Sequence, residues 1–238
     1  MMATAMKIIQ IKLSLSNVYL VLCQRPMLID AGSPNEASKI IAAVERAGVA
    51  PRELSLILLT HGHGDHAGSA KALREITGAA IALHTADVFM ARQGHSGLLG
   101  STRWTGRISK PFVDKPFDAF TPDIVLNDET SLASFGVAGR VICTPGHTAG
   151  SVSAFIGDKA DEAIVGDVLM GGHLGGLVRP SQPRLHYFAE DLSAVYASLA
   201  QLIALAPRTL YVGHGGPLAL ADVVRLFGGR KKKGVVVS

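Results

Sequence analysis

The chain has 238 residues, of which 48% are hydrophobic and 18% charged, and its formal net charge is +4. This composition excludes a disordered or collagen-like chain, and the length is enough to bury a core without a disulfide. Charges, glycines and prolines interrupt every apolar run before the roughly 18–20 residues that a membrane span needs. We therefore expect a single domain over residues 1–238, with a flexible basic tail at 228–238, and no membrane partner.

Residues 1–23 could be mistaken for a signal peptide. Lysines and a glutamine interrupt their apolar segment, and the alternation of side chains instead predicts two strands, over 7–13 and 17–22. The two cysteines, Cys23 and Cys143, lack the spacing of a disulfide framework. We therefore expect a cytoplasmic protein.

Strand and helix patterns alternate along the rest of the chain. Short apolar runs bounded by glycine, proline or polar residues predict strands, and apolar residues at helical spacing predict helices. The predicted strands are 27–30, 54–59, 79–83, 124–126, 131–135, 140–144, 151–156, 163–165 and 209–212, and the predicted helices are 36–47, 66–77, 85–93, 190–206 and 218–227. Strands and helices in two comparable halves indicate an α/β layered sandwich.

Two long stretches, 94–123 and 170–187, show no clear periodicity. Long irregular segments in a compact domain usually serve a function, so we expect them to wall a pocket for a small-molecule substrate. Their basic side chains would suit an anionic substrate. The residues expected to contact it are Trp104, Arg107, His173 and Tyr187. His173 and His186 add further donor atoms, although loop histidines are more often exposed.

A dense cluster of metal-binding residue types follows the predicted strand at 54–59. The cluster is Thr60-His61-Gly62-His63-Gly64-Asp65-His66, with three imidazoles and one carboxylate within six residues. Imidazole nitrogen and carboxylate oxygen are the usual donors to zinc, and iron or manganese also fits them. The two glycines leave room for a metal to approach the backbone. This segment predicts a metal site.

Three isolated residues downstream each stand directly after a glycine at the end of a predicted strand. They are His147, Asp167 and His214. Taken singly, each would be a structural residue about as often as a functional one. Together with the cluster at 60–66 they complete a site.

On these motifs the chain resembles the metallo-β-lactamase superfamily of dinuclear metal hydrolases, over about residues 7–227. The resemblance implies a four-layer αβ/βα sandwich of two mixed sheets flanked by helices, with the site at one edge of the sheets. It also implies a ligand set. The first metal would be held by His61, His63 and His147, the second by Asp65, His66 and His214, and Asp167 would bridge the two.

The chemistry expected of such a site is hydrolysis. Two zinc ions would acidify a bridging water to a hydroxide nucleophile and polarise the substrate oxygen. Asp65 or Asp167 would act as the catalytic carboxylate that takes or relays a proton, and the sequence does not choose between them. Asp30 matches a family carboxylate near the metals and would orient a ligand histidine, unless it only caps a turn.

Departures from known branches leave the subfamily unresolved. The second metal position offers Asp65 and His66 where one class of lactamase has a cysteine, and Asp167 argues against the other dinuclear lactamases. His63 stands where flavodiiron proteins have glutamate. The segment after Asp167 lacks both the arginine of glyoxalase II relatives and the tyrosine of quorum-signal lactonases.

Three functions follow as hypotheses. The first is a hydrolase of a carboxylic-acid derivative, namely a thioester, lactone or lactam. One alternative is a phosphodiesterase or small nuclease that uses the same metals, which the net positive charge of the chain suggests. The other is a non-catalytic metal-binding sensor. No basic stripe interleaved with aromatic residues supports nucleic acid as a partner. A homo-oligomer is compatible with the sequence.

Overall fold

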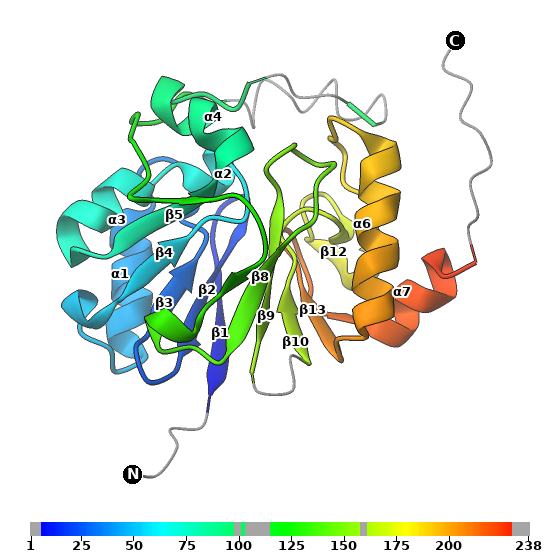
Figure 1. Ribbon diagram of the computed structural model, residues 1–238, viewed down its shortest axis with the longest axis horizontal. Coiled ribbons are helices and arrows are strands. Elements are labelled where there is room, and N and C mark those ends of the chain that lie inside the picture. The colour runs from blue at the N-terminus through cyan, green and yellow to red at the C-terminus, as the bar shows by residue number, and fades with distance from the viewer. Residues whose placement is uncertain (1–5, 98–100, 103–114, 158–160, 230–238) are drawn as a thin grey trace.

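Two six-stranded sheets pack face to face, and helices cover their outer faces (Figure 1). The structure is a computed structural model that describes residues 6–97, 101–102, 115–157 and 161–229. The four layers confirm the αβ/βα sandwich of two mixed sheets that the sequence resemblance implied. None of the described helices is long and apolar enough to cross a membrane.

The first sheet has its strands in chain order. They are β1 (Lys7–Lys12), β2 (Asn17–Leu22), β3 (Met27–Ile29), β4 (Leu56–Leu58), β5 (Ala80–His84) and β6 (Ile124–Leu126). Strands β1 to β3 pair antiparallel, whereas β3 to β6 pair parallel. The carboxyl ends of β3, β4 and β5 therefore lie at the same edge.

The second sheet has the order β14-β13-β10-β9-β8-β7. Its strands are β7 (Thr130–Ser131), β8 (Gly139–Cys143), β9 (Val152–Ile156), β10 (Glu162–Ile164), β13 (Thr209–Tyr211) and β14 (Leu218–Ala219). Only β10 and β13 pair parallel, so their carboxyl ends also share an edge. A separate hairpin is formed by β11 (Met170–His173) and β12 (Val178–Arg184).

Helices on opposite sides of the molecule complete the outer layers (Figure 1). The first sheet is covered by α1 (Ala37–Arg46) and α3 (Ala70–Thr77), and the second by α6 (Leu192–Leu205) and α7 (Leu220–Phe227). Shorter elements are α2 (Gly64–Ala67), α4 (Val88–Gln93), η1 (Pro51–Glu53), η2 (Thr85–Asp87) and η3 (Ala133–Phe135).

Strand β2 shows how the core is divided between the layers. Tyr19 and Val21 face the second sheet, whereas Val18 and Leu20 pack in the apolar cluster beneath the helices α1 and α3. All four are fully buried because both faces of the sheet are covered. The hydroxyl of Tyr19 donates to the carbonyl of Val212, 2.7 Å away, which satisfies its polar atom across the two sheets.

Three sequence expectations about local structure are wrong. The strand predicted at 131–135 is instead the end of β7 (Thr130–Ser131) followed by the 3-10 helix η3 (Ala133–Phe135). The predicted helix 66–77 is interrupted at Gly68 and Ser69, between α2 and α3, where a Cβ on Gly68 would overlap the backbone of Gly64 and of Pro34. The stretch 170–187 contains the β11–β12 hairpin, which the sequence hid because most β12 side chains are exposed and so lack alternating hydrophobicity. Residues 230–238 of the predicted tail lie outside the described residues.

Candidate metal centre

The predicted metal-binding residues all follow the carboxyl ends of strands. His61 and His63 come directly after β4, His147 lies in the loop between β8 and β9, Asp167 follows β10 and His214 follows β13. The backbone amide of Val152 donates to the carbonyl of Thr60 at 2.8 Å, which joins the two sheets at this edge. Segments far apart in the chain are thereby brought to one point.

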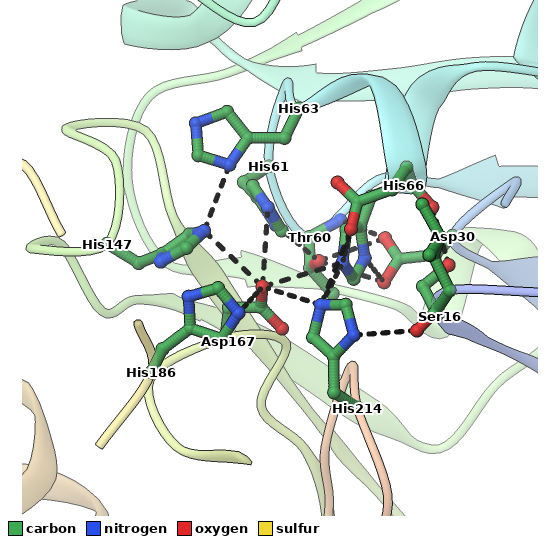
Figure 2. Close-up of polar contacts among 12 residues, drawn as sticks. Ser16, Asp30, Thr60, His61, His63, His66, His147, Asp167, His186 and His214 are labelled. Atoms are coloured by element: carbon green, nitrogen blue, oxygen red, sulfur yellow. Dashed lines mark hydrogen bonds and ion pairs between the residues drawn. The ribbon is translucent and has the colours of Figure 1, made fainter. Parts of the chain in front are cut away.

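The side chains converge on Asp167, whose carboxylate lies at the centre of a ring of imidazoles (Figure 2). All of them are buried except Asp65, whose side chain is 12% exposed. Their donor atoms form several sets within 4.8 Å of one another. The sets are His61-His63-His147, His61-His66-Asp167, Asp65-His66-His214 and His147-Asp167-His186.

Hydrogen bonds on the outer ring nitrogens fix the tautomers of three histidines. Nδ1 of His66 lies 2.8 Å from Oδ2 of Asp30, that of His147 lies 2.9 Å from the carbonyl of Phe188, and that of His214 lies 2.7 Å from the carbonyl of Leu15. Because these oxygens only accept, each neutral ring carries its hydrogen on Nδ1. The Nε2 lone pairs are then directed into the site, as metal ligands require.

The inner nitrogens of His66 and His214 face each other 3.4 Å apart. With both Nδ1 atoms already donating, each inner nitrogen of a neutral ring presents a lone pair that can bind a cation. Two tetrahedral ligands at the usual Zn–N distance of about 2.0–2.1 Å are separated by a similar span. Three more buried atoms of the site, Nε2 of His61, Nε2 of His63 and Oδ1 of Asp167, have no hydrogen-bond partner among the described residues. The donor set therefore fits a metal.

The electrostatics of the site divide the histidines into two groups. Burial lowers the pKa of His63 and of His147 to about 3, so both are neutral at pH 7. Burial also opposes the charged forms of His66 and His214, but Asp167 and Asp65 outweigh it and raise both pKa values above the ordinary histidine range. A positive charge is thus most stable beside the carboxylates.

Burial alone would raise the pKa of Asp167, but the surrounding histidines, His214 first, hold it well below its usual range. This carboxylate therefore stays ionised. Asp30 lies deeper: its Oδ1 accepts from the amide of Thr60 at 2.7 Å, and its Oδ2 accepts from His66. It contacts the histidine that we expected it to orient.

A second buried carboxylate, Asp87, connects two loops of the site. It accepts hydrogen bonds from the amide of Gly62 at 2.9 Å, the amide of Gly150 at 2.9 Å and the hydroxyl of Thr148 at 2.7 Å. Gly62 lies between two of the predicted ligands, and Thr148 follows His147. The sequence analysis did not single out Asp87, because its three donors come from distant segments.

His186 also enters the site, contrary to the expectation of an exposed loop histidine. Its side chain is 10% exposed, and its Nε2 lies 3.3 Å from Oδ2 of Asp167. Figure 2 shows the ring between those of His147 and His214. Burial lowers its pKa to about 3. Its position depends on the turn of the chain after β12, which no local pattern revealed.

A cavity of about 630 Å³ opens onto the centre. Its described lining includes Asp65, Asp167, His186 and His214 and a largely apolar wall, to which Tyr187 contributes. The predicted substrate residue His173 lies on β11, where its Nε2 accepts a hydrogen bond from Arg184 at 2.7 Å. Trp104 and Arg107 lie outside the described residues.

Residues 11–214 match the sequence pattern of the metallo-beta-lactamase superfamily. The chain belongs to this superfamily. The match spans every strand end that contributes to the metal centre, from β3 to β13.

Relatives in the superfamily cover most of the chain. It is 32% identical over 193 residues to a hydroxyacylglutathione hydrolase of Acidiphilium cryptum (strain JF-5), covering 81% of this chain and 62% of that one. Among solved structures, BLEG-1 B3 metallo-beta-lactamase matches with a TM-score of 0.68 and 24% identity, covering 92% of this chain and 97% of that one. TTHA1623 in a di-iron-bound form matches with a TM-score of 0.65 and 26% identity, covering 91% and 97%.

Membership in the superfamily establishes a metallo-hydrolase fold with a metal site of histidine and aspartate side chains. Neither the identity of the metal nor the substrate follows from it, because loops over a common scaffold set specificity. Those properties have to be argued from the residues of this chain.

Proposed function

We propose that this protein is a dinuclear zinc hydrolase that acts on a carboxylic-acid derivative, with a thioester as its preferred class. In this proposal His61, His63 and His147 hold one metal, and Asp65, His66 and His214 hold the other. Asp167 lies between the two groups and would bridge them. Each group forms one of the compact donor sets of the site.

The observation that carries the proposal is the convergence of inward donor atoms: the nitrogens of His66 and His214, 3.4 Å apart, lie beside the unpartnered Nε2 of His61 and Oδ1 of Asp167. Both rings direct lone pairs inward because Asp30 and the carbonyl of Leu15 take the outer hydrogens. A structural core would not leave Nε2 of His61 and Oδ1 of Asp167 buried without a hydrogen-bond partner, since unpaired buried polar atoms are costly. A bound cation accounts for the arrangement.

Bound zinc supplies Lewis acidity, which activates a water as nucleophile and polarises a substrate carbonyl. The two carboxylates, Asp167 and Asp65, differ in their ability to accept a proton. Asp167 stays ionised among the histidines and is a poor proton acceptor because its pKa is held low. Asp65 lines the cavity and is partly exposed, so we propose it as the carboxylate that receives the proton of the attacking water.

The substrate class is argued from the cavity wall. Six of its described residues are large and apolar: Leu13, Leu15, Met170, Leu174, Leu177 and Phe188. Lys12 is the one lysine or arginine among the described lining residues, so an apolar acyl chain with a single negative charge fits better than a polyanion. The relative that is a hydroxyacylglutathione hydrolase takes a thioester, which supports this choice.

The test compares initial rates of the zinc-reconstituted protein on a thioester, a lactone, a β-lactam and a phosphodiester. We expect the thioester to be hydrolysed fastest and the phosphodiester not at all. His147→Ala and His214→Ala should each bind one metal fewer and lose at least about 100-fold in kcat. Asp118→Asn, which changes an exposed carboxylate, is the matched control. Turnover of the phosphodiester alone, or full rates in metal-stripped protein, would contradict the proposal.

Iron is the competing metal, since TTHA1623 was solved in a di-iron-bound form. Metal analysis of the protein as purified distinguishes the two.

The proposed cytoplasmic location is consistent with the free thiols of Cys23 and Cys143. It predicts that both cysteines of the protein extracted from cells react with a thiol reagent.

A further inference from the structure

His186 differs from the other histidines of the site in the bond that its outer nitrogen makes. The backbone amide of Phe188 donates to Nδ1 of His186 at 3.2 Å. The carbonyl of Phe188 also lies near this nitrogen, at 3.3 Å, but that carbonyl already accepts from Nδ1 of His147 at 2.9 Å. The amide needs an acceptor, whereas the carbonyl already has a donor.

One tautomer satisfies all of these groups. If Nδ1 of His186 accepts from the amide of Phe188, the ring hydrogen is on Nε2. That nitrogen is the one directed into the site, 3.3 Å from Oδ2 of Asp167. His66, His147 and His214 have the opposite arrangement, with their hydrogens outward and their lone pairs inward.

We propose that His186 is a catalytic residue rather than an additional metal ligand: its Nε2–H donates a hydrogen bond to the oxygen of the reacting carbonyl of the substrate. This inference rests on the proposed hydrolase function. A nitrogen that carries a hydrogen has no lone pair for a metal, so the donor set His147-Asp167-His186 is not a third metal site. The same nitrogen is well suited to stabilise the negative charge that develops on a carbonyl oxygen.

The position of the ring supports this role. His186 lines the cavity, and its ring lies 4.6 Å from that of His147 and 5.1 Å from that of His214, centroid to centroid. Each of these neighbours belongs to one of the two proposed metal groups, and Nε2–H is directed toward Oδ2 of Asp167, which lies between them (Figure 2). A substrate oxygen bound beside this carboxylate would lie within reach of both groups.

The backbone around His186 is held in place. The hydroxyl of Thr102 donates to the carbonyl of His186 at 2.7 Å, and the amide of Thr102 donates to the carbonyl of Tyr187 at 2.8 Å. A donor that is fixed before the substrate arrives loses little entropy when charge develops, which is the condition for effective oxyanion stabilisation.

The first test does not depend on turnover. In zinc-loaded protein, ¹⁵N NMR of the histidine rings should show His186 with its hydrogen on Nε2, and His147 and His214 with theirs on Nδ1. In cobalt-substituted protein, His186→Ala should keep both metals and leave the visible absorption spectrum unchanged, whereas His214→Ala should alter both. Loss of a metal from His186→Ala, or a hydrogen on Nδ1 of His186, would overturn the proposal.

The second test is kinetic. His186→Ala should lower kcat on the best substrate by about 100- to 1,000-fold with little change in KM, which is the effect of removing one oxyanion donor. His186→Gln places an amide N–H near the position of Nε2 and should restore part of the rate, whereas His186→Asn is too short and should not. A kcat for His186→Ala within about twofold of wild type would overturn the proposal.

The two proposals fail in different ways. If the wild-type protein holds two metals but hydrolyses none of the substrates, the proposed function is wrong. The NMR and cobalt measurements then still decide whether His186 is a metal ligand. If the wild-type protein is active but His186→Ala is equally active, only the role of His186 is wrong.

Discussion

Oδ2 of Asp30 lies 2.8 Å from Nδ1 of His66, and this contact joins the turn after β3 to helix α2. Asp30 has a positive φ of 67°, a backbone conformation that asparagine also tolerates. Asp30→Asn should therefore fold, but it removes the negative charge that fixes the His66 ring. We expect metal affinity to fall about 10- to 100-fold, measured by competition with a zinc chelator. An affinity equal to that of the Asp118→Asn control would contradict this role of Asp30.

Gly213 is a second test of how closely the site is packed. A Cβ at this position would overlap Oδ1 of Asp167 and lie 2.6 Å from Cε1 of His66. Gly213→Ala should displace these side chains and reduce the bound metal below two per chain, measured by elemental analysis. Gly229→Ala is the matched control, because its Cβ would meet nothing within 4 Å. Full metal content in Gly213→Ala would show that the carboxylate can move without losing the metal.

The metal-free protein should lose stability as the pH falls. Burial holds the pKa of His63, His147 and His186 at about 3 in the folded state, below the ordinary value of 6.5. Between these values the unfolded chain binds protons that the folded chain does not, so the stability that these three histidines contribute is full above about pH 6.5 and declines toward pH 3.

Urea denaturation of metal-stripped protein between pH 4.5 and 6.5 measures this effect, with about 1.4 kcal/mol per pH unit for each such histidine. His186→Gln removes one of these groups. Its slope should be shallower than that of wild type by about that amount. Equal slopes would show that His186 is not held neutral in the folded protein.

Much of the fold could be predicted because its signals are local. Strand β2 alternates side chains between two buried faces, and the helix predicted at 36–47 is present as α1 with Gly48 in a left-handed conformation after it. The hairpin β11–β12 could not be predicted in this way, because its second strand is exposed on most positions. Alternating hydrophobicity arises because one face of a strand is buried, so an exposed strand does not show it.

The residues of the candidate site also fall into those that local sequence patterns identify and those that they do not. The cluster at 60–66 and the residues after strand ends, His147, Asp167 and His214, could be identified because metal ligands are distinctive residue types in distinctive spacings. Asp87 and His186 carry no such pattern. Each acts through partners that are distant in the chain, such as Gly150 for Asp87 and Asp167 for His186.

The sequence by itself determined the layered architecture, the superfamily resemblance and the residues offered to the metals, since these depend on residue type, order and spacing. Only the tertiary structure decided which nitrogen of each histidine is directed inward. That choice rests on acceptors and donors such as Asp30, the carbonyl of Leu15 and the amide of Phe188, which folding brings beside the rings. A ring is equally able to bind a metal or to donate a hydrogen bond, and the group on its far side selects between the two.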